Sequence, residues 1–598
     1  MPRPSALVDI DSIRTRKYSD WTIIKRLLSY IGPHLVLFIP ISLFLLLLVG
    51  LDLVGPLLLA RVLDMLGQDP IDLSGILWIS LGYVGIMAVN GFLSYQQTML
   101  LQGLGQKVIY AIRKDVFDHI EALSISQFNK VPVGKLVTRV TSDTSTLNTM
   151  YTDVLVNLFR NSLTIVGAFI TMFVMQPRLS LYISAVVPFV AIASVVFRKF
   201  TRRAYRNVRT QVSVINAFLS EHLSGMKLIQ IFNREPKKLD EFRERSAKLR
   251  KYQLNQMTTF AIYRPFMYFL YVVALIIALW FGGKLAIQGV ISFGILYAFT
   301  DYIHKFFDPI QELAEQFDTM QAAFTSGERI FEILDTKPEV VDAADAQPIV
   351  FRGKIEFEHV WFAYIGEDWI LKDVSFVVEP RETVAFVGAT GSGKTTILSL
   401  IVRNYDIQKG RILIDGVDIR GIEIGSLRKQ VGQMLQDVFL FSGTVESNIR
   451  LGDEEITDAD IVEAARYVNA DRFIDRLPAK YAEPVRERGN NFSSGQRQLL
   501  SFARTIVHRP SVMILDEATA NIDTETEELI QESLAKMMNI GTMIIVAHRL
   551  STIQHVDKII VMQKGKIIEM GNHQELLRNK GHYYMLYRLQ YDRKLENI

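Results

Sequence analysis

Six long apolar runs in the first half of the chain constrain its fold more than any other feature. They cover residues 35–59, 75–93, 154–175, 179–197, 265–280 and 291–307. A helix needs ~20 mostly apolar residues to cross a bilayer. Polar residues interrupt the last two runs, and a single run of this kind could also form a buried core helix. Six in succession predict a bundle of six transmembrane helices.

Composition indicates that a soluble part accompanies this bundle. Hydrophobic residues make up 49% of the 598 residues, yet charged residues still make up 22%. The formal net charge of +3 is too balanced to indicate a nucleic-acid partner. The chain has no cysteine, which excludes disulfides, thiolate metal sites and a cysteine nucleophile. Residues 1–20 are polar and lack an apolar core, so we expect no removable signal peptide.

The basic residues between the runs predict the orientation. Residues 94–153 and 198–264 are long and rich in Lys and Arg, whereas the turns around Arg178 and Lys284 hold one basic residue each. Positive charge favours the cytoplasmic side, so the long segments and both termini should be cytoplasmic. Apolar residues recur in them at helical spacing, which predicts membrane helices that extend into the cytoplasm. Residues 21–31 predict an amphipathic helix on the inner membrane surface.

Two acidic residues fall inside the predicted spans. Asp52 lies in the first and Asp301 in the sixth, and such residues are functional candidates by default. Asp301 and Lys305 have the spacing of a helical ion pair, which would neutralise the charge locally. Alternatively, Asp301 holds a cationic substrate.

The chain changes character after the sixth run. We expect a transmembrane domain over residues 1–325, a linker over 326–348 and a second domain over 349–598. Short β-rich runs alternate with helical patterns in the second domain. This alternation predicts an α/β fold with a mainly parallel sheet and antiparallel strands at its start.

A phosphate-binding motif stands inside the second domain. It reads Gly388-Ala389-Thr390-Gly391-Ser392-Gly393-Lys394-Thr395. The motif follows the β-rich run 383–387 and precedes a helix that starts near Thr396, as a P-loop requires. Its backbone N–H groups and the helix N-terminus would hold the phosphates of ATP. Lys394 would reach the β- and γ-phosphates, Thr395 would bind Mg²⁺, and Thr396 belongs to the same nucleotide-binding set. The alternative is a chance glycine-rich turn.

Further catalytic candidates follow two strands of this domain. The apolar run 512–515 ends in Asp516 and Glu517. We expect Asp516 to hold the metal and Glu517 to polarise the attacking water, because phosphoryl transfer depends on positioning and charge stabilisation. His548 follows the next strand and would contact the γ-phosphate, unless it has only a structural role.

The order of these motifs carries a family resemblance. The P-loop is followed by Gln436, the segment 492–496, the sequence Ile-Leu-Asp-Glu-Ala-Thr at 514–519, and His548. This series resembles the ATP-binding cassette (ABC) family. With six spans ahead of it, the chain is similar to bacterial ABC exporter half-transporters of the multidrug type. The resemblance implies a six-helix membrane domain fused to an α/β P-loop cassette, helices exchanged between two half-transporters, and two ATP molecules held between two cassettes.

The resemblance also implies roles for single residues. Tyr364 would stack on adenine, Gln436 would sense Mg²⁺ and the membrane domain and take part in catalysis, and Asp523 would lie in the loop that crosses to the other subunit. Residues 487–489 match the segment that touches the coupling helices. These helices are expected at residues 129–134 and 224–229.

One motif departs from the family pattern. The signature usually reads Leu-Ser-Gly-Gly-Gln, but here it reads Phe492-Ser493-Ser494-Gly495-Gln496. In the resembled family this segment binds the γ-phosphate of the partner's ATP through the serine hydroxyl, backbone N–H groups and a helix N-terminus. Ser494 adds a side chain where glycine would allow close approach and an unusual φ. Either the change is neutral, or the chain gives its partner a weakened signature, as in heterodimeric exporters. The second interpretation predicts a non-identical partner with an intact signature and a substituted catalytic glutamate.

These features leave two transport functions open. The first is ATP-driven export of amphipathic compounds or drugs across the cytoplasmic (inner) membrane. The second is a lipid or lipopeptide flippase, with peptide export as a variant, because a fold does not define a substrate. A membrane-anchored ATPase acting on cytoplasmic protein would leave the six runs and the two coupling segments without a purpose.

Overall fold

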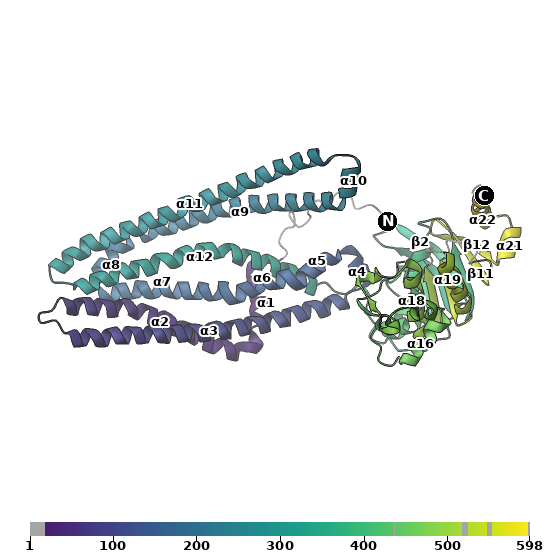
Figure 1. Ribbon diagram of the computed structural model, residues 1–598, viewed down its shortest axis with the longest axis horizontal. Helices are drawn as coiled ribbons and strands as arrows, with labels where there is room; N and C mark the ends of the chain where they lie inside the picture. The colour runs from purple at the N-terminus through teal and green to yellow at the C-terminus, as the bar shows by residue number, and fades with distance from the viewer. Residues whose placement is uncertain (1–17, 436, 517–523, 547–552, 596–598) are drawn as a thin grey trace. The chain divides into compact units, whose positions relative to one another are not determined.

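A computed structural model describes residues 18–435, 437–516, 524–546 and 553–595. The described residues form two compact units (Figure 1). The helical unit combines the chain up to Glu121 with Pro132–Thr336, and the nucleotide unit combines Ala122–Val131 with the chain from Lys337 onward. A short stretch from the first half of the sequence therefore folds with the second domain.

Long helices build the helical unit, and their positions follow the six apolar runs. They are α2 (Leu35–Leu66), α3 (Leu73–Ala122), α7 (Leu155–Met175), α9 (Val187–Ser224), α11 (Glu235–Ile287) and α12 (Phe293–Leu334). By length and composition, 5 helical segments of the described chain could cross a membrane. The segment that contains α12 is not among them, since Asp301, Lys305 and Asp308 interrupt its apolar stretch. The helices α3, α9 and α11 extend well past their apolar runs, as the basic connections predict.

Short elements join these helices. They are α4 (Ile125–Lys130), α5 (Val133–Thr138), the π-helical turn η3 (Arg139–Asp143), α6 (Thr144–Thr149), the π-helical turn η4 (Met150–Val154), α8 (Pro177–Ser184) and α10 (Met226–Ile231). The predicted span over residues 179–197 falls within a helical segment, Pro177–Ser224, that could cross a membrane, and a short break separates α8 from α9 inside it. Pro188 lies in the first turn of α9, where a missing N–H and a fixed φ cost nothing.

The helix α1 (Asp20–Ser29) buries part of its apolar face against another helix. Ile23 and Leu27 are buried, and a Cβ at Gly327 of α12 would come within 3.1 Å of Ile23. Arg26 binds the carboxylate of Asp335, just beyond α12, through two hydrogen bonds of 2.6 and 2.8 Å. Part of the apolar face therefore packs on α12, while Trp21 and Leu28 remain exposed, and the position of α1 on the membrane surface stays a prediction.

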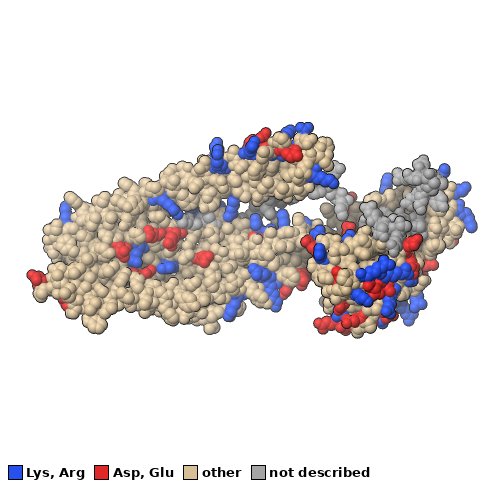
Figure 2. All heavy atoms as spheres, in the orientation of Figure 1, with Lys and Arg blue, Asp and Glu red and all other residues tan. Residues whose placement is uncertain are grey.

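Close helix packing forms the core of the helical unit. Figure 1 shows α9 alongside α11 and α12 alongside α7. Gly294 of α12 permits one tight approach, since a Cβ there would lie 2.0 Å from the Ala60 carbonyl oxygen. Asp64 of α2 accepts hydrogen bonds from the Ser292 hydroxyl at 2.6 Å and the Gly294 N–H at 2.8 Å, which satisfies the start of α12. Figure 2 shows a mostly uncharged surface over the half of this unit that contains α2 and α8, as a bilayer would require.

Two sheets organise the nucleotide unit. The antiparallel sheet has the order β2-β1-β4-β5, and the main sheet has the order β12-β11-β3-β10-β9-β6. All neighbours in the main sheet are parallel except β11 and β12. The strands are β1 (Ile355–Ala363), β2 (Trp369–Val378), β3 (Thr383–Val387), β4 (Lys409–Ile414), β5 (Val417–Asp418), β6 (Val431–Met434), β7 (Gly443–Thr444), β8 (Pro484–Val485), β9 (Val512–Asp516), β10 (Thr542–Val546), β11 (Lys558–Gln563) and β12 (Lys566–Gly571). The predicted mainly parallel sheet with antiparallel strands at its start is confirmed.

Helices surround the main sheet. They are α13 (Lys394–Ile401), α14 (Ile424–Lys429), α15 (Val445–Arg450), α16 (Asp458–Tyr467), α17 (Asp471–Ile474), α18 (Ser494–Val507), α19 (Thr524–Met537), α21 (His573–Arg578) and α22 (His582–Leu595). The inner strands β3 and β10 are buried along their whole length, as expected for a sheet covered on both faces. This rigid sheet holds the P-loop at the carboxyl end of β3.

Candidate functional site

The P-loop turns sharply between β3 and α13, and its glycines make the turn possible. Gly391 and Gly393 have φ values of +82° and +104°, in the region that favours glycine. A Cβ at Gly388 would lie 2.2 Å from the Met562 carbonyl oxygen, and one at Gly393 would lie 2.7 Å from the Leu371 side chain. Other residues at these positions would therefore displace the loop.

Lys394 lies folded back over the loop. Its Nζ donates hydrogen bonds to the Gly388 and Ala389 carbonyl oxygens, at 2.8 and 3.1 Å. The residue is only 5% exposed. Burial lowers the pKa of Lys394, and the nearby Asp516 carboxylate partly offsets this effect. The loop thus holds a desolvated ammonium group that an anion would stabilise.

Other groups of the loop fit the phosphates of ATP. The Ser392 hydroxyl is buried and has no hydrogen-bond partner among the described residues. Buried polar groups are rarely left unpaired, so a ligand oxygen suits this position. The tip residues Ala389 and Thr390 are exposed, and the N-terminal N–H groups of α13 have no partner within the helix. These features favour a bound polyphosphate over a chance glycine-rich turn.

Hard oxygen ligands for Mg²⁺ also occur beside the loop. Thr395 is exposed at the start of α13, and Asp516 ends β9. Hydroxyl and carboxylate oxygens, together with phosphate oxygens, are the ligands that Mg²⁺ prefers. The residues present therefore fit this ion.

Tyr364 lies beside the start of α13. Its hydroxyl is 3.1 Å from the Thr396 hydroxyl. Its ring makes edge-to-face contacts with Phe362 and Tyr405, at centroid distances of 4.9 and 5.1 Å. The side chain is 43% exposed. A ring that is fixed at its edge and still accessible is suited to stacking on adenine.

The altered signature forms the N-terminus of α18. The Ser493 hydroxyl accepts a hydrogen bond from the Gln496 N–H at 3.2 Å, and the Gln496 side chain accepts one from the Ser493 N–H at 2.9 Å. Ser494 is the first residue of α18 and has helical backbone, while Gly495 is buried. The expectation that glycine at position 494 serves an unusual φ was therefore wrong. Only the close approach of a ligand could require glycine there.

Four of the predicted site residues lie outside the described residues. They are Gln436, Glu517, Asp523 and His548. The described Asp516 immediately precedes Glu517 at the end of β9. Their roles stay predictions.

The two acidic residues of the predicted spans have different surroundings. Asp52 lies 3.5 Å from Arg160 and accepts a hydrogen bond of 3.4 Å from the Asn90 amide. The expected pair between Asp301 and Lys305 does not occur in the described helical unit. Instead, His304 pairs with Asp308 at 3.0 Å, so local neutralisation by Lys305 does not explain Asp301.

Short helices overlap both predicted coupling segments. The second, α10, overlaps the predicted range closely. The first predicted range, 129–134, overlaps the end of α4 at Lys130 and the start of α5, and Pro132 separates these two helices. Proline disfavours helical backbone in the preceding residue, and Val131 is extended.

Within the nucleotide unit, α4 is fastened by several polar contacts. Lys130 forms an ion pair of 2.7 Å with Glu339, and the Ser126 hydroxyl also binds this carboxylate. The Gln127 amide donates to the Lys337 carbonyl oxygen at 2.8 Å. The Asn129 amide donates to the Tyr405 hydroxyl at 3.0 Å.

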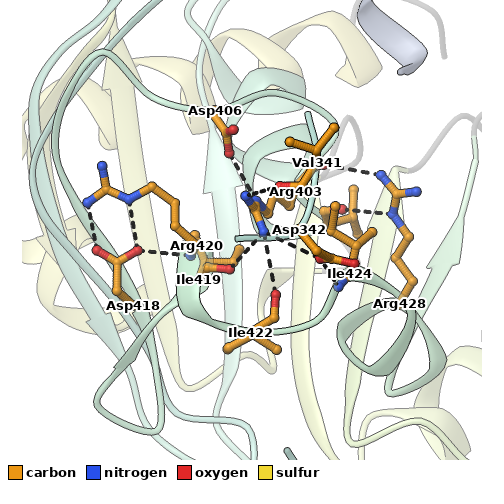
Figure 3. Close-up of polar contacts among 11 residues, drawn as sticks. Val341, Asp342, Arg403, Asp406, Asp418, Ile419, Arg420, Ile422, Ile424 and Arg428 are labelled. Atoms are coloured by element: carbon orange, nitrogen blue, oxygen red, sulfur yellow. Dashed lines mark hydrogen bonds and ion pairs between the residues drawn. The ribbon is translucent and has the colours of Figure 1, made fainter. Parts of the chain in front are cut away.

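Sequence reasoning missed the turn that follows α13 (Figure 3). Arg403 is 3% exposed, pairs with Asp406 at 3.0 Å and donates to the Val341 carbonyl oxygen at 3.1 Å. Arg428 donates to the carbonyl oxygens of Val402 and Arg403, at 3.3 and 3.1 Å. Arginines are normally exposed, so nothing in the sequence pattern marks Arg403 as buried or either arginine as a fastener of this turn.

The P-loop, the parallel sheet and the apolar helical unit together define a membrane-bound P-loop ATPase. Residues 37–310 match the family model of the ABC transporter transmembrane region, and residues 371–520 match that of the ABC transporter. The chain is 38% identical, over 88% of its length and 78% of the relative's, to a Bacillus subtilis protein named "probable multidrug resistance ABC transporter ATP-binding/permease protein YheH". It is 33% identical, over 95% of its length and 94% of the relative's, to an ATP-dependent lipid A-core flippase of Syntrophus aciditrophicus.

A solved structure agrees with these relatives. The structure of a bacterial Atm1-family ABC exporter with ATP bound matches with a TM-score of 0.79 and 26% identity, over 93% of this chain and 98% of that chain. The protein belongs to the ABC transporter family and is an ATP-hydrolysing half-transporter of the bacterial exporter type.

Proposed function

We propose that this chain exports amphipathic compounds or drugs across the cytoplasmic (inner) membrane, as one subunit of a dimer with a non-identical partner. The observation that carries the proposal is a P-loop with an orphaned buried hydroxyl and a desolvated lysine, in one chain with apolar helices long enough to span a bilayer. The nucleotide unit and both termini lie in the cytoplasm in this proposal. The basic extensions of α9 and α11 support that orientation.

ATP binding draws on the groups of the P-loop. Lys394 turns from the loop carbonyls to the β- and γ-phosphates, and Ser392 gains a phosphate oxygen as partner. Thr395, Asp516 and Gln436 hold Mg²⁺, which neutralises phosphate charge when it is bound. Glu517 orients the attacking water and His548 holds the γ-phosphate. These assignments place charge-stabilising groups where phosphoryl transfer needs them.

In this proposal, closure of two cassettes on ATP turns the membrane cavity outward, and hydrolysis resets it. The short helix α4 passes the motion on, because it follows α3 in the chain yet is fastened to Glu339, Lys337 and Tyr405 of the nucleotide unit. A displacement of this unit then moves the end of α3.

The helical unit and the relatives support two candidate substrate classes. A multidrug relative supports amphipathic small molecules, and the polar group of Asp52, Asn90 and Arg160 offers contacts for a polar end. The named lipid A-core flippase supports the second candidate, transport of a lipid or lipopeptide on the same scaffold. Peptide export is a variant of this second candidate.

The non-identical partner is proposed from Ser494. A homodimer would place this serine beside both ATP molecules, whereas a heterodimer confines it to one. The side chain lies at the N-terminus of α18, where it would narrow the approach of a phosphate. Asp523 would contact the opposite subunit in this arrangement.

Reconstitution with and without the partner tests the proposal. The chain alone and a co-expressed pair would be assayed for ATPase stimulation by drugs, lipids and peptides. We expect the largest stimulation by amphipathic drugs in the pair. Equal stimulated activity of the chain alone would contradict the heterodimer, and stimulation only by lipids would favour the flippase.

A further inference from the structure

Tyr405 contacts both α4 and Tyr364. It follows α13 by four residues, in the turn that Arg403 and Arg428 fasten (Figure 3). Its hydroxyl accepts the 3.0 Å hydrogen bond from Asn129 of α4. Its ring meets the Tyr364 ring edge to face, with an interplanar angle of 82°. One side chain therefore touches both the short helix and the tyrosine.

We propose that Tyr405 is a positioning residue for nucleotide binding, which holds Tyr364 in place for adenine and joins the base site to α4 through Asn129. The inference rests on the proposed stacking of Tyr364 on adenine. It goes further by assigning a link between occupancy of the base site and the position of α4.

Three contacts fix the Tyr364 side chain. Phe362 and Tyr405 hold its ring, and the Thr396 hydroxyl lies within hydrogen-bond distance of its hydroxyl. Phe362 is buried and also contacts Tyr405, at a centroid distance of 5.6 Å. Phe362, Tyr364 and the partly exposed Tyr405 thus form an aromatic cluster, in which the buried Phe362 is the rigid support of the Tyr364 ring. Removing Tyr405 frees Tyr364 at the ring edge that Tyr405 contacts.

The turn that contains Tyr405 is itself held firmly. The Arg403 guanidinium binds Asp406 on one side of Tyr405 in the sequence and the Val341 carbonyl oxygen on the chain that precedes the first strand. Displacing Tyr405 would therefore disturb the contacts of Arg403 with both Asp406 and Val341. A shift of Asn129 is transmitted to the Tyr405 ring rather than absorbed by the turn.

Binding measurements on the full chain with Mg²⁺ separate this role from a general structural one. The probes are ATP and inorganic tripolyphosphate, which lacks the base. Tyr405→Ala should weaken ATP binding about three- to tenfold, the value of one aromatic contact, and leave tripolyphosphate binding unchanged. Tyr405→Phe keeps the ring and should keep the ATP affinity. Equal weakening for both probes would overturn the inference.

The link to α4 has its own measurement, hydrogen exchange of the α4 amides with and without ATP. We expect ATP to alter their exchange in the wild type, and expect Tyr405→Phe or Asn129→Ala to remove most of that change. The double variant should lose no more than either single variant, because both remove one hydrogen bond. Tyr467→Phe is the matched control, since this hydroxyl donates to the Lys536 carbonyl oxygen at 2.9 Å, outside the aromatic cluster.

The outcomes distinguish this inference from the proposed role of Tyr364. Unchanged ATP affinity in Tyr364→Ala would contradict adenine stacking itself. Weakened affinity in Tyr364→Ala with wild-type affinity in Tyr405→Ala would contradict only the positioning role. An unchanged ATP-dependent exchange of α4 in Tyr405→Phe would contradict the link.

Discussion

Replacing Lys394 with methionine should affect ATP binding and stability in opposite directions. Methionine keeps most of the side-chain volume and removes the charge. A hydrogen bond from a charged group contributes about 1.5–3 kcal/mol, which corresponds to roughly 10- to 150-fold in affinity. Among the described residues, the ammonium has two carbonyl partners near 3 Å. Burial lowers its pKa, so the cost of keeping it charged is fully present below the lowered pKa and is gone once pH rises above the ordinary pKa of lysine.

Two measurements on the purified full chain follow from this reasoning. ATP affinity should fall by the factor above, and the unfolding temperature without nucleotide should stay equal or rise. At an ATP concentration of about 100 times the wild-type Kd, ligand stabilisation should drop from about 2.7 to about 0.9 kcal/mol for a 30-fold loss of affinity. Lys566→Met, at an exposed position of β12, is the control. Near-normal ATP affinity, or marked destabilisation without nucleotide, would refute the reasoning.

Further predictions concern the catalytic carboxylate, the base site and the contacts of α4. Glu517→Gln should bind ATP normally and lose most hydrolysis, as shown by trapped nucleotide in a closed dimer; near-full turnover would mean that another residue orients the water. Tyr364→Trp should keep the ATP affinity that Tyr364→Ala loses. If both variants bind ATP as tightly as the wild type, this tyrosine is a core residue. Hydrogen bonds from Lys130 and then Ser126 lower the pKa of Glu339, so this contact is present at neutral pH and is lost as pH falls through the lowered pKa. Glu339→Gln should imitate that loss at pH 7 and increase hydrogen exchange in α4, whereas unchanged exchange would show that α4 is held without this charge.

Strong periodic and motif signals predicted most of the architecture. The apolar runs gave the positions of the long helices, because ~20 consecutive apolar residues have few soluble alternatives. The P-loop glycines were predicted from spacing alone, and their φ values and close contacts explain why glycine is needed. Tyr364, by contrast, was placed by resemblance.

Features that depend on tertiary contact were not predictable. The apolar face of α1 fits a membrane surface and a helix partner equally well, and only the close approach at Gly327 reveals the partner. The contact between Asn129 and Tyr405 joins positions far apart in the sequence, so no spacing marks it. The backbone conformation of Ser494 was not predicted correctly, because a glycine in a motif can be needed either for an unusual φ or for the space that a missing side chain leaves. The sequence alone does not distinguish these two reasons.

Transport in proteoliposomes tests the central claim most directly. The chain and its partner would be reconstituted so that the nucleotide units face outward, and ATP-dependent accumulation of an amphipathic dye would be followed inside the vesicles. The account predicts accumulation in the presence of ATP and Mg²⁺ and its loss in Lys394→Met. Robust ATP hydrolysis without ATP-dependent movement of any amphipathic drug, lipid or peptide would contradict it.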